Sequence, residues 1–408
     1  MWTERYPRRP MRRLVALVIV GLFALPAAAH AIALSTMKAS WDKRERRMGS
    51  HAGAYVADLG TGRVLYSRNA DKTLAPASNE KLLTTATALV RLGQDTTLDT
   101  IVRPAPDAVL QPDGTLAGDL IVVGAGDPSL DDVAMRDLVA QLRRAGIRRV
   151  TGAIVADESL FDNRRGSYDS GFGYDSDLGG ELGALTWGHG RFDSRGPAFY
   201  AASRLRYFLK LGKVRVSSKV SVSPTATLDT PTLAIHQSPT IAELVSITNH
   251  PSDNFYAETL LKLLGARAGT GGSTAKGIVA AQEALRQLGV KAEMVDGSGL
   301  SRVDRVSPHQ IVRLLAAMAG RGEGEAFRAS LAAPGEWGTL EHRMTRTAAR
   351  DHCRAKTGTL IGVSALSGYC FDLAGHTIVF SLLENGVCAV CVKKLEDQMV
   401  PMLARYEG

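Results

Sequence analysis

Cysteine is absent from the first 352 residues of this 408-residue chain, and its four copies, Cys353, Cys370, Cys388 and Cys391, lie near the C-terminus. Aromatic residues make up only 6% of the chain, but 45% of its residues are hydrophobic and 22% are charged. This is ordinary globular composition, which excludes a disordered, collagen-like or purely coiled-coil chain. The length predicts about two or three domains.

The N-terminus carries half of the net positive charge. Met1–Ala33 contributes +4 of the formal +8 through five arginines and one glutamate. The remaining charge of +4 is too small to indicate a nucleic-acid partner. An apolar run, Leu14–Leu25, is followed by Pro26 and by small residues near Ala29–Ala33, which is the layout of a cleaved signal peptide.

A membrane anchor is the alternative for this N-terminal segment. A spanning helix needs about 20 apolar residues, whereas the uninterrupted run Leu14–Leu25 has twelve. No cysteine is present there to carry a lipid, and no later stretch is long and apolar enough to span a bilayer. We predict that residues 1–33 are a signal peptide and that the protein is exported, to a periplasm or to the extracellular side and cell wall.

Four cysteines in an exported protein indicate disulfides. A zinc site is the alternative, but no histidine lies at finger spacing from Cys388 or Cys391. A thioredoxin-like role for that pair lacks the expected βαβ context. Cys353 and Cys370 face each other if a hairpin turns near residues 361–362. We therefore expect the pairs Cys353–Cys370 and Cys388–Cys391, the second closing a very short loop.

The pattern of apolar residues predicts helix-rich sequence on both sides of a β-rich middle. We expect a hairpin (54–58 and 63–67), a helix (80–92) and a βαβ-like unit (119–123, 131–145 and 150–156), then a surface loop over 163–180. Helices are expected at 240–249, 255–264, 273–288, 308–319 and 392–406, and two antiparallel strands at 364–371 and 376–383. We therefore predict one discontinuous catalytic domain, residues 34–98 and 238–408, with residues 99–237 inserted into it.

Three short motifs occur in order along the chain: Ser78-x-x-Lys81, Ser252-x-Asn254 and Lys356-Thr357-Gly358. The first is weak by itself, because S-x-x-K also occurs at 35–38, 40–43 and 273–276. Only the copy at Ser78 follows a predicted hairpin and opens a long apolar helix. Residues three apart share one helical face, with about 5–6 Å between their Cβ atoms, so an amine on Lys81 can reach the Ser78 hydroxyl.

The other two motifs stand where polar side chains can face a cleft. Ser252-x-Asn254 lies between two predicted helices, and Lys356-Thr357-Gly358 leads to a predicted strand. Glycine on a strand permits close approach of a ligand backbone. A serine hydroxyl needs a base to become a nucleophile, and with no histidine at a comparable position, Lys81 is the candidate.

Together these motifs resemble the active-site set of serine penicillin-binding proteins and β-lactamases. Five segments further resemble the D-alanyl-D-alanine carboxypeptidase/endopeptidase family of penicillin-binding protein 4, as does the insertion with Gly126-Asp127-Pro128. They are Asp58-Leu59-x-Thr61-Gly62, Pro76-Ala77-Ser78-Asn79, His250-Pro251-Ser252-Asp253-Asn254, Asp296-Gly297-Ser298-Gly299-Leu300-Ser301 and Lys356-Thr357-Gly358-Thr359. The resemblance covers most of residues 52–385. It implies an α/β (α+β) transpeptidase-like fold of the serine β-lactamase type, with a β-rich domain inserted between the first two motifs.

The resemblance also implies catalytic roles. Ser78 is the nucleophile and Lys81 its base, with Lys356 as a second cation that lowers the pKa of Lys81. Ser252 relays a proton toward the leaving amine, and Asn254 holds Lys81 and a substrate amide.

Binding roles follow in the same way. The backbone N–H groups of Ser78 and Thr359 form the oxyanion hole. Lys356, Thr357 and Thr359 suit a terminal carboxylate, beside Gly358. Asp157 and Phe161, in a segment that resembles the stem-peptide side of the family's cleft, are substrate-binding candidates. Asp157 could bind the ammonium of a diamino acid; an ordinary polar turn is the alternative. His250, Asp296 and Ser298 are interpreted as structural.

The implied substrates are peptidoglycan stem peptides ending in D-Ala-D-Ala, with β-lactams as covalent inhibitors and with neither a metal nor another cofactor. The insertion is shorter than the family's, and no E-x-x-L-N segment like that of class A β-lactamases is present. Two other functions stay open: a penicillin-recognising sensor with little turnover, and a β-lactamase or esterase. The sequence leaves the oligomeric state and the balance of carboxypeptidase and endopeptidase activity undetermined.

Overall fold

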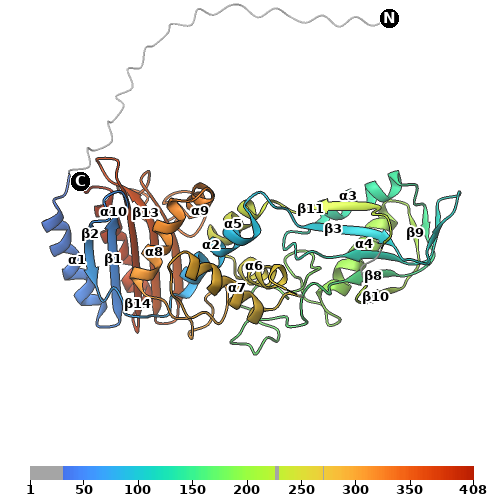
Figure 1. Ribbon diagram of the computed structural model, residues 1–408, viewed down its shortest axis with the longest axis horizontal. Helices are drawn as coiled ribbons and strands as arrows, with labels where there is room; N and C mark the ends of the chain where they lie inside the picture. Colours follow the sequence, from blue (N-terminus) through green and yellow to red (C-terminus); the bar gives the residue numbers. More distant parts are fainter. Residues whose placement is uncertain (1–30, 226–228, 270) are drawn as a thin grey trace, which may run out of the picture. The chain divides into compact units, whose positions relative to one another are not determined.

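A five-stranded antiparallel sheet joins the two ends of the chain in the computed structural model, which describes residues 31–225, 229–269 and 271–408 (Figure 1). Most of the predicted signal peptide, residues 1–30, therefore lies outside the described residues. The strand order is β12-β13-β14-β1-β2. The strands are β1 (Ala52–Asp58), β2 (Val64–Arg68), β12 (Cys353–Leu360), β13 (Val363–Phe371) and β14 (Thr377–Asn385). Because β1 pairs with β14, the hairpin of β1 and β2 and the three later strands β12, β13 and β14 form one continuous sheet.

Helices cover both faces of this sheet. On one face lie α1 (Leu34–Met48) and α10 (Ala389–Leu403), whose apolar side chains share a core with Val56, Leu366 and Phe380. On the other face lie α2 (Glu80–Leu92) and α8 (Pro308–Ala319), which pack with Ala365 and Leu383. The alternation of side chains along each strand thus divides the core between two helical layers.

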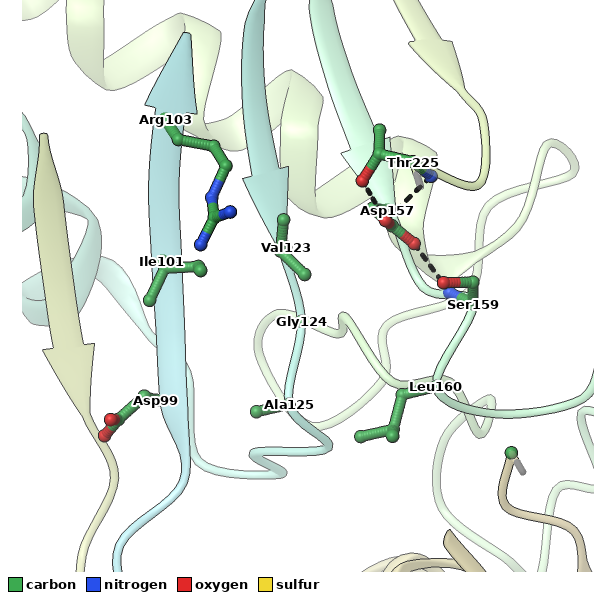
Figure 2. Close-up of a pocket in the computed structure, with 11 residues that line it drawn as sticks. Asp99, Ile101, Arg103, Val123, Gly124, Ala125, Asp157, Ser159, Leu160 and Thr225 are labelled. Atoms are coloured by element: carbon green, nitrogen blue, oxygen red, sulfur yellow. Dashed lines mark hydrogen bonds between the residues drawn. The ribbon is translucent and has the colours of Figure 1, made fainter. Parts of the chain in front are cut away.

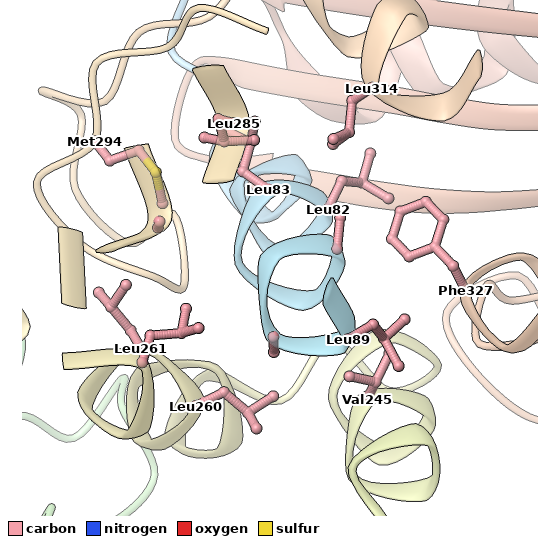
Figure 3. Packing of buried hydrophobic residues seen from close by; sticks show 14 of the residues in the cluster. Leu82, Leu83, Leu89, Val245, Leu260, Leu261, Leu285, Met294, Leu314 and Phe327 are labelled. Atoms are coloured by element: carbon pink, nitrogen blue, oxygen red, sulfur yellow. The ribbon is translucent and has the colours of Figure 1, made fainter. Parts of the chain in front are cut away.

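Helix α2 is the centre of the second layer, and ten of its 13 residues are buried. Four other helices surround it: α5 (Ile241–Asn249), α6 (Asn254–Arg267), α7 (Thr274–Gln287) and α9 (Gly324–Ala329). Figure 3 shows Leu82, Leu83 and Leu89 of α2 packed among their side chains. Burial of each leucine stabilises the fold by roughly 1.5–3 kcal/mol. The N-terminus of α2, where the first motif lies, is therefore held in place by packing.

Residues 99–237, called the inserted segment below, form two further sheets. The five-stranded sheet has the order β10-β8-β6-β3-β11, and the four-stranded sheet has the order β4-β5-β7-β9. The five-stranded sheet contains β3 (Asp99–Pro104), β6 (Leu120–Val123), β8 (Ile154–Asp157), β10 (Val220–Val222) and β11 (Ala234–Gln237). The smaller sheet contains β4 (Val109–Leu110), β5 (Thr115–Ala117), β7 (Arg149–Val150) and β9 (Arg215–Val216). Helices α3 (Asp132–Arg144) and α4 (Pro197–Leu211) bury their apolar faces in the core of this segment.

The structure confirms most of the expected elements, including the parallel pairing of β6 with β8 around α3. Both expected disulfides, Cys353–Cys370 and Cys388–Cys391, are present. One expectation was wrong: the single strand expected over 150–156 is two short strands, β7 and β8, in different sheets. Helix α1 is an element that the sequence patterns did not predict, and its narrow apolar stripe of Met37, Trp41 and Met48 is buried.

Within the described ranges, no helix combines the length and the apolar character that crossing a bilayer requires.

Helix α1 contains a buried acid. Glu45 is fully buried, and neither carboxyl oxygen has a hydrogen-bond partner among the described residues. Burial raises the pKa of Glu45 from its ordinary 4.5 to about 7, although the charge of Arg68 lowers it. The folded protein therefore holds this carboxyl in its neutral form at mildly acidic pH.

We expect Glu45→Gln to stabilise the protein selectively at high pH. The pKa of Glu45 is raised on folding, so wild-type stability is lost as the pH rises through the folded value of about 7. A neutral glutamine does not ionise, so in urea unfolding it should gain about 2–3 kcal/mol over wild type at pH 8 and little at pH 4.5. Glu341→Gln, at an exposed position, is the control. An equal gain at both pH values would contradict a titrating Glu45.

Candidate active site

The first motif lies where a short turn enters α2. Residues Ala77–Asn79 form one turn of 3-10 helix, and Ala77 has a positive φ of 47°. A non-glycine residue in this region costs about 1–2 kcal/mol, and such strain is concentrated at functional sites. The turn places Ser78 three residues before Lys81, and the Lys81 Nζ lies 3.1 Å from the Ser78 Oγ.

Lys81 is fully buried and joins the first two motifs. Besides Ser78, its Nζ donates to Asn254 Oδ1 at 2.6 Å and to the Ser298 carbonyl at 2.7 Å. Burial lowers the pKa of Lys81 to about 8, although the charges of Asp296 and Glu258 raise it. At pH 7 about one molecule in ten therefore carries a neutral amine, which can accept the Ser78 proton.

Burial is the main cause of the lowered pKa of Lys81, and Lys356, the cation expected to lower it, is not among its principal causes. Lys356 is fully buried, and burial holds its pKa well below the usual range, with the charge of Lys81 acting in the same direction. Among the described residues its Nζ donates to one acceptor, the Thr357 carbonyl at 2.9 Å. Desolvation, rather than a neighbouring cation, is the main reason that the Lys81 ammonium loses its proton readily enough for the neutral amine to serve as a base.

The loop 296–301 positions the third acceptor of Lys81. Glu258 Oε1 accepts hydrogen bonds from the Gly297 and Ser298 N–H groups, both at 2.8 Å. Asp296 Oδ1 accepts the Gly299 N–H at 2.6 Å. These bonds orient the Ser298 carbonyl toward Lys81. Sequence analysis interpreted Asp296 and Ser298 as structural and missed Glu258, although Glu258 follows Asn254 by one helical turn and so shares its face.

The third motif lies on β12, the edge strand of the main sheet. A methyl group on Gly358 would lie 2.8 Å from Pro76 O and 3.1 Å from Ser78 N, so glycine lets the strand approach the Ser78 turn. Sequence analysis had assigned this space to a ligand. Ala355 donates its N–H away from β13, to Ala332 O. Residues alternate along a strand, so the Thr357 and Thr359 N–H groups point to the same outer edge.

The second motif is in contact with the inserted segment. Asp253 caps α6 by accepting the Tyr256 N–H at 2.9 Å, and its other oxygen lies 2.8 Å from His189 Nε2. Asn254 Nδ2 donates to the Asp177 carbonyl at 2.8 Å. Ser252 has a positive φ of 67°, and its hydroxyl has no hydrogen bond within the described part of the chain. No local sequence pattern connects His189 or Asp177 with this motif.

Asp157 lies apart from these motifs, at the end of β8. It lines a cavity of about 490 Å³ with Asp99, Arg103, Ser159 and Leu160 (Figure 2). Burial raises the pKa of Asp157, but hydrogen bonds from Ser159 and Thr225 outweigh this and give a net lowering. The carboxylate is therefore negative at neutral pH. Asp157 Oδ1 accepts the Ser159 N–H at 2.8 Å, and Oδ2 accepts the Thr225 N–H at 2.9 Å.

Phe161 does not line this cavity. Its side chain is 6% exposed and packs in the core that includes α2, near Gly126 and Lys262. A methyl group on Gly126 would lie 2.7 Å from the Phe161 ring. The ring therefore fills space between the inserted segment and α6, which is a packing role.

The fold and the meeting of a serine, a buried lysine and an asparagine define a serine hydrolase of the class that includes penicillin-binding proteins and β-lactamases. The chain belongs to the D-Ala-D-Ala carboxypeptidase 3 (S13) family, whose model matches residues 37–177 and 189–406. It is 30% identical to a D-alanyl-D-alanine carboxypeptidase of Actinomadura sp., over 88% of this chain and 82% of the relative.

Solved structures of other proteins share the fold. Penicillin-binding protein 4 of Haemophilus influenzae has a TM-score of 0.77 at 20% identity, covering 90% of this chain and 99% of that one. A predatory endopeptidase of Bdellovibrio bacteriovorus, acylated by penicillin G, has a TM-score of 0.56 at 17% identity, covering 86% of this chain and 92% of that one.

We expect Glu258→Gln to move the pH dependence of Ser78 acylation to lower pH. The glutamine oxygen can still accept the Gly297 and Ser298 N–H groups, while the negative charge that raises the pKa of Lys81 is removed. The rate of penicillin acylation should therefore reach half of its plateau below the pH of about 8 that Lys81 sets in wild type.

Glu258→Ala separates positioning from charge, because it removes the two hydrogen bonds as well. We expect about 1–3 kcal/mol of destabilisation and a lower plateau rate. Acylation profiles of Glu258→Gln and wild type that coincide at every pH would contradict an electrostatic contact between Glu258 and Lys81.

Proposed function

We propose that the chain is an exported serine DD-peptidase that forms an acyl-enzyme on Ser78. The observation that carries this proposal is the Lys81 amine, buried, 3.1 Å from the Ser78 hydroxyl and with a pKa of about 8. A base with a pKa near the working pH combines a useful neutral fraction with enough driving force to take a proton. The substrates are peptidoglycan stem peptides that end in D-Ala-D-Ala, or cross-links that follow a D-Ala carbonyl.

Acylation begins when the neutral Lys81 amine takes the Ser78 proton. The Ser78 Oγ attacks the carbonyl carbon of the penultimate D-Ala. The carbonyl oxygen becomes an oxyanion, which accepts hydrogen bonds from the N–H groups of Ser78 and Thr359. The closeness of Gly358 to Ser78 N and the outward direction of the Thr359 N–H support this pair of donors. A donor of this kind contributes about 2.7–4 kcal/mol to transition-state stabilisation in another serine peptidase.

The tetrahedral intermediate collapses when the protonated Lys81 gives up its proton, which Ser252 relays to the leaving amine. The C–N bond breaks, D-alanine leaves, the acyl group stays on Ser78, and Lys81 is neutral again. Water then attacks the ester while Lys81 accepts a proton from that water, and Lys81 returns this proton to the Ser78 Oγ as the shortened peptide departs. Each proton removed is returned, so the cycle consumes one water and no cofactor.

Substrate binding uses groups on both sides of Ser78. Asn254 is bound through its oxygen to Lys81, and its N–H₂ group, which donates one hydrogen bond to the Asp177 carbonyl, has a second N–H that can hold a substrate carbonyl. The hydroxyls of Thr357 and Thr359 at the edge of β12 and the Lys356 side chain suit a terminal carboxylate. β-Lactams carry an acyl carbonyl and a carboxylate in the same relation, and the Bdellovibrio endopeptidase of this fold is acylated by penicillin G.

Loss of Ser78 should abolish acylation, whereas loss of Lys81 should slow it. In Ser78→Ala we expect no covalent labelling by fluorescent penicillin and no D-alanine release from a diacyl D-Ala-D-Ala peptide. In Lys81→Met the hydroxyl remains but lacks its base, so both rates should fall about 10²–10⁴-fold. Mass spectrometry of the labelled peptide checks the site.

The same measurements distinguish the other functions. Stoichiometric labelling without D-alanine release would identify a sensor, and sustained hydrolysis of a chromogenic cephalosporin would identify a β-lactamase. A label on any serine other than Ser78, or full activity in Lys81→Met, would overturn the proposal.

Asp157 is proposed to bind the ammonium group of a diamino acid in the stem peptide. We expect Asp157→Asn to raise the KM for a peptide with a free side-chain amine and to leave kcat nearly unchanged, because the carboxylate is remote from the bond that breaks. The peptide with an acetylated amine is the control and should be cleaved equally by both proteins. Equal losses on both peptides would indicate a structural role for Asp157 instead.

A further inference from the structure

Residues 163–190 of the inserted segment, called the covering loop here, contain no helix or strand but bind the second motif and its neighbours. Four polar contacts join the loop to residues outside the inserted segment. They are Arg164 O to Lys262 Nζ at 2.6 Å, Asp169 Oδ1 to Ser301 Oγ at 2.8 Å, Asp177 O to Asn254 Nδ2 at 2.8 Å and His189 Nε2 to Asp253 Oδ2 at 2.8 Å. Sequence analysis expected an ordinary surface loop over part of this region.

The Asp177 contact uses one of the two N–H donors of the Asn254 side chain. The Asn254 oxygen accepts a hydrogen bond from the Lys81 amine, so the N–H₂ group of Asn254 faces away from Lys81 and binds the Asp177 carbonyl. The proposed chemistry needs the same N–H₂ group for a substrate carbonyl. The Asp177 carbonyl therefore occupies one of the two positions at which the carbonyl of an acyl donor could bind.

His189 holds this part of the loop against α6. Its Nε2 contacts the Asp253 carboxylate and its Nδ1 contacts the Gly179 carbonyl at 3.1 Å, two residues from Asp177. The imidazole packs 4.5 Å from the Phe255 ring between centroids. The His189 and Asp253 side chains are 37% and 21% exposed. The contact is therefore partly open to solvent.

We propose that the covering loop is a specificity element, because the Asp177 carbonyl and the carbonyl of an acyl donor bind the same N–H₂ group of Asn254 and so compete for it. This inference rests on the proposed function. A donor whose own amide carbonyl binds Asn254 competes with the loop, while a donor that lacks this carbonyl does not. Loosening the loop should therefore favour the first kind of donor over the second.

Two penicillins test this difference. Benzylpenicillin has a side-chain amide carbonyl, whereas 6-aminopenicillanic acid has the same bicyclic core and carboxylate with a free amine. We would measure the second-order rate of Ser78 acylation by intact-protein mass spectrometry for the full chain and three variants. His189→Ala and Asp169→Ala loosen the loop at separate points. His309→Ala is the matched control, because His309 also lies beside an aspartate, Asp71 at 2.8 Å, and an aromatic ring, Tyr55.

The expected result is a rate ratio of benzylpenicillin to 6-aminopenicillanic acid that rises about three- to tenfold in both loop variants, which is the effect of removing one competing hydrogen bond. The ratio should stay unchanged in His309→Ala. A ratio that is unchanged or lower in both loop variants would overturn the inference and leave the proposed function intact. Absence of Ser78 acylation by either penicillin in wild type would instead overturn the proposed function and this inference with it.

Discussion

The burial of one amine, that of Lys81, is the constraint on which the active site depends. Removing an ammonium from water is costly, so desolvation lowers its pKa. The same burial requires acceptors for every N–H, and Ser78, Asn254 and Ser298 supply them. Each acceptor comes from a different part of the chain, so one side chain fixes how α2, α6 and the loop 296–301 meet. The leucine packing around α2 then keeps the amine from moving toward water.

Four carboxyl groups act on Lys81 in the direction opposite to burial: the charges of Asp296, Glu258, Asp253 and Glu80 raise its pKa. Burial in turn raises the pKa of three of these groups, that of Glu258 to about 7, that of Glu80 well above its usual range, and that of Asp296 above its ordinary value. A carboxyl with a raised pKa carries less negative charge at a given pH and so stabilises the ammonium less. Burial of the amine therefore outweighs the carboxyl charges, and the pKa of Lys81 is about 8.

The sequence predicts what local patterns encode. The bounds of α2 follow from its apolar face and from Gly93, and those of α8 follow from Ser307, Pro308 and Gly320. The register of β12 with β13 follows from the turn at 361–362, which places Cys353 opposite Cys370. Helix α1 is missed because its surface is mostly charged. Contacts such as His189 with Asp253 connect residues 64 positions apart, and no periodic pattern encodes them.

Gly358 and Asn254 show why spacing alone cannot assign the site completely. Glycine on the edge strand suggests room for a ligand, but the structure uses that room for the Ser78 turn. Asn254 is recognisable as part of a motif, yet its two ends have different functions. Its oxygen helps to hold the base, and its nitrogen faces the inserted segment. Because one planar amide joins the two, a shift of the covering loop that moves the nitrogen must also move the oxygen bound to Lys81. Positioning of the base and selection of the acyl donor are thus coupled through a single side chain.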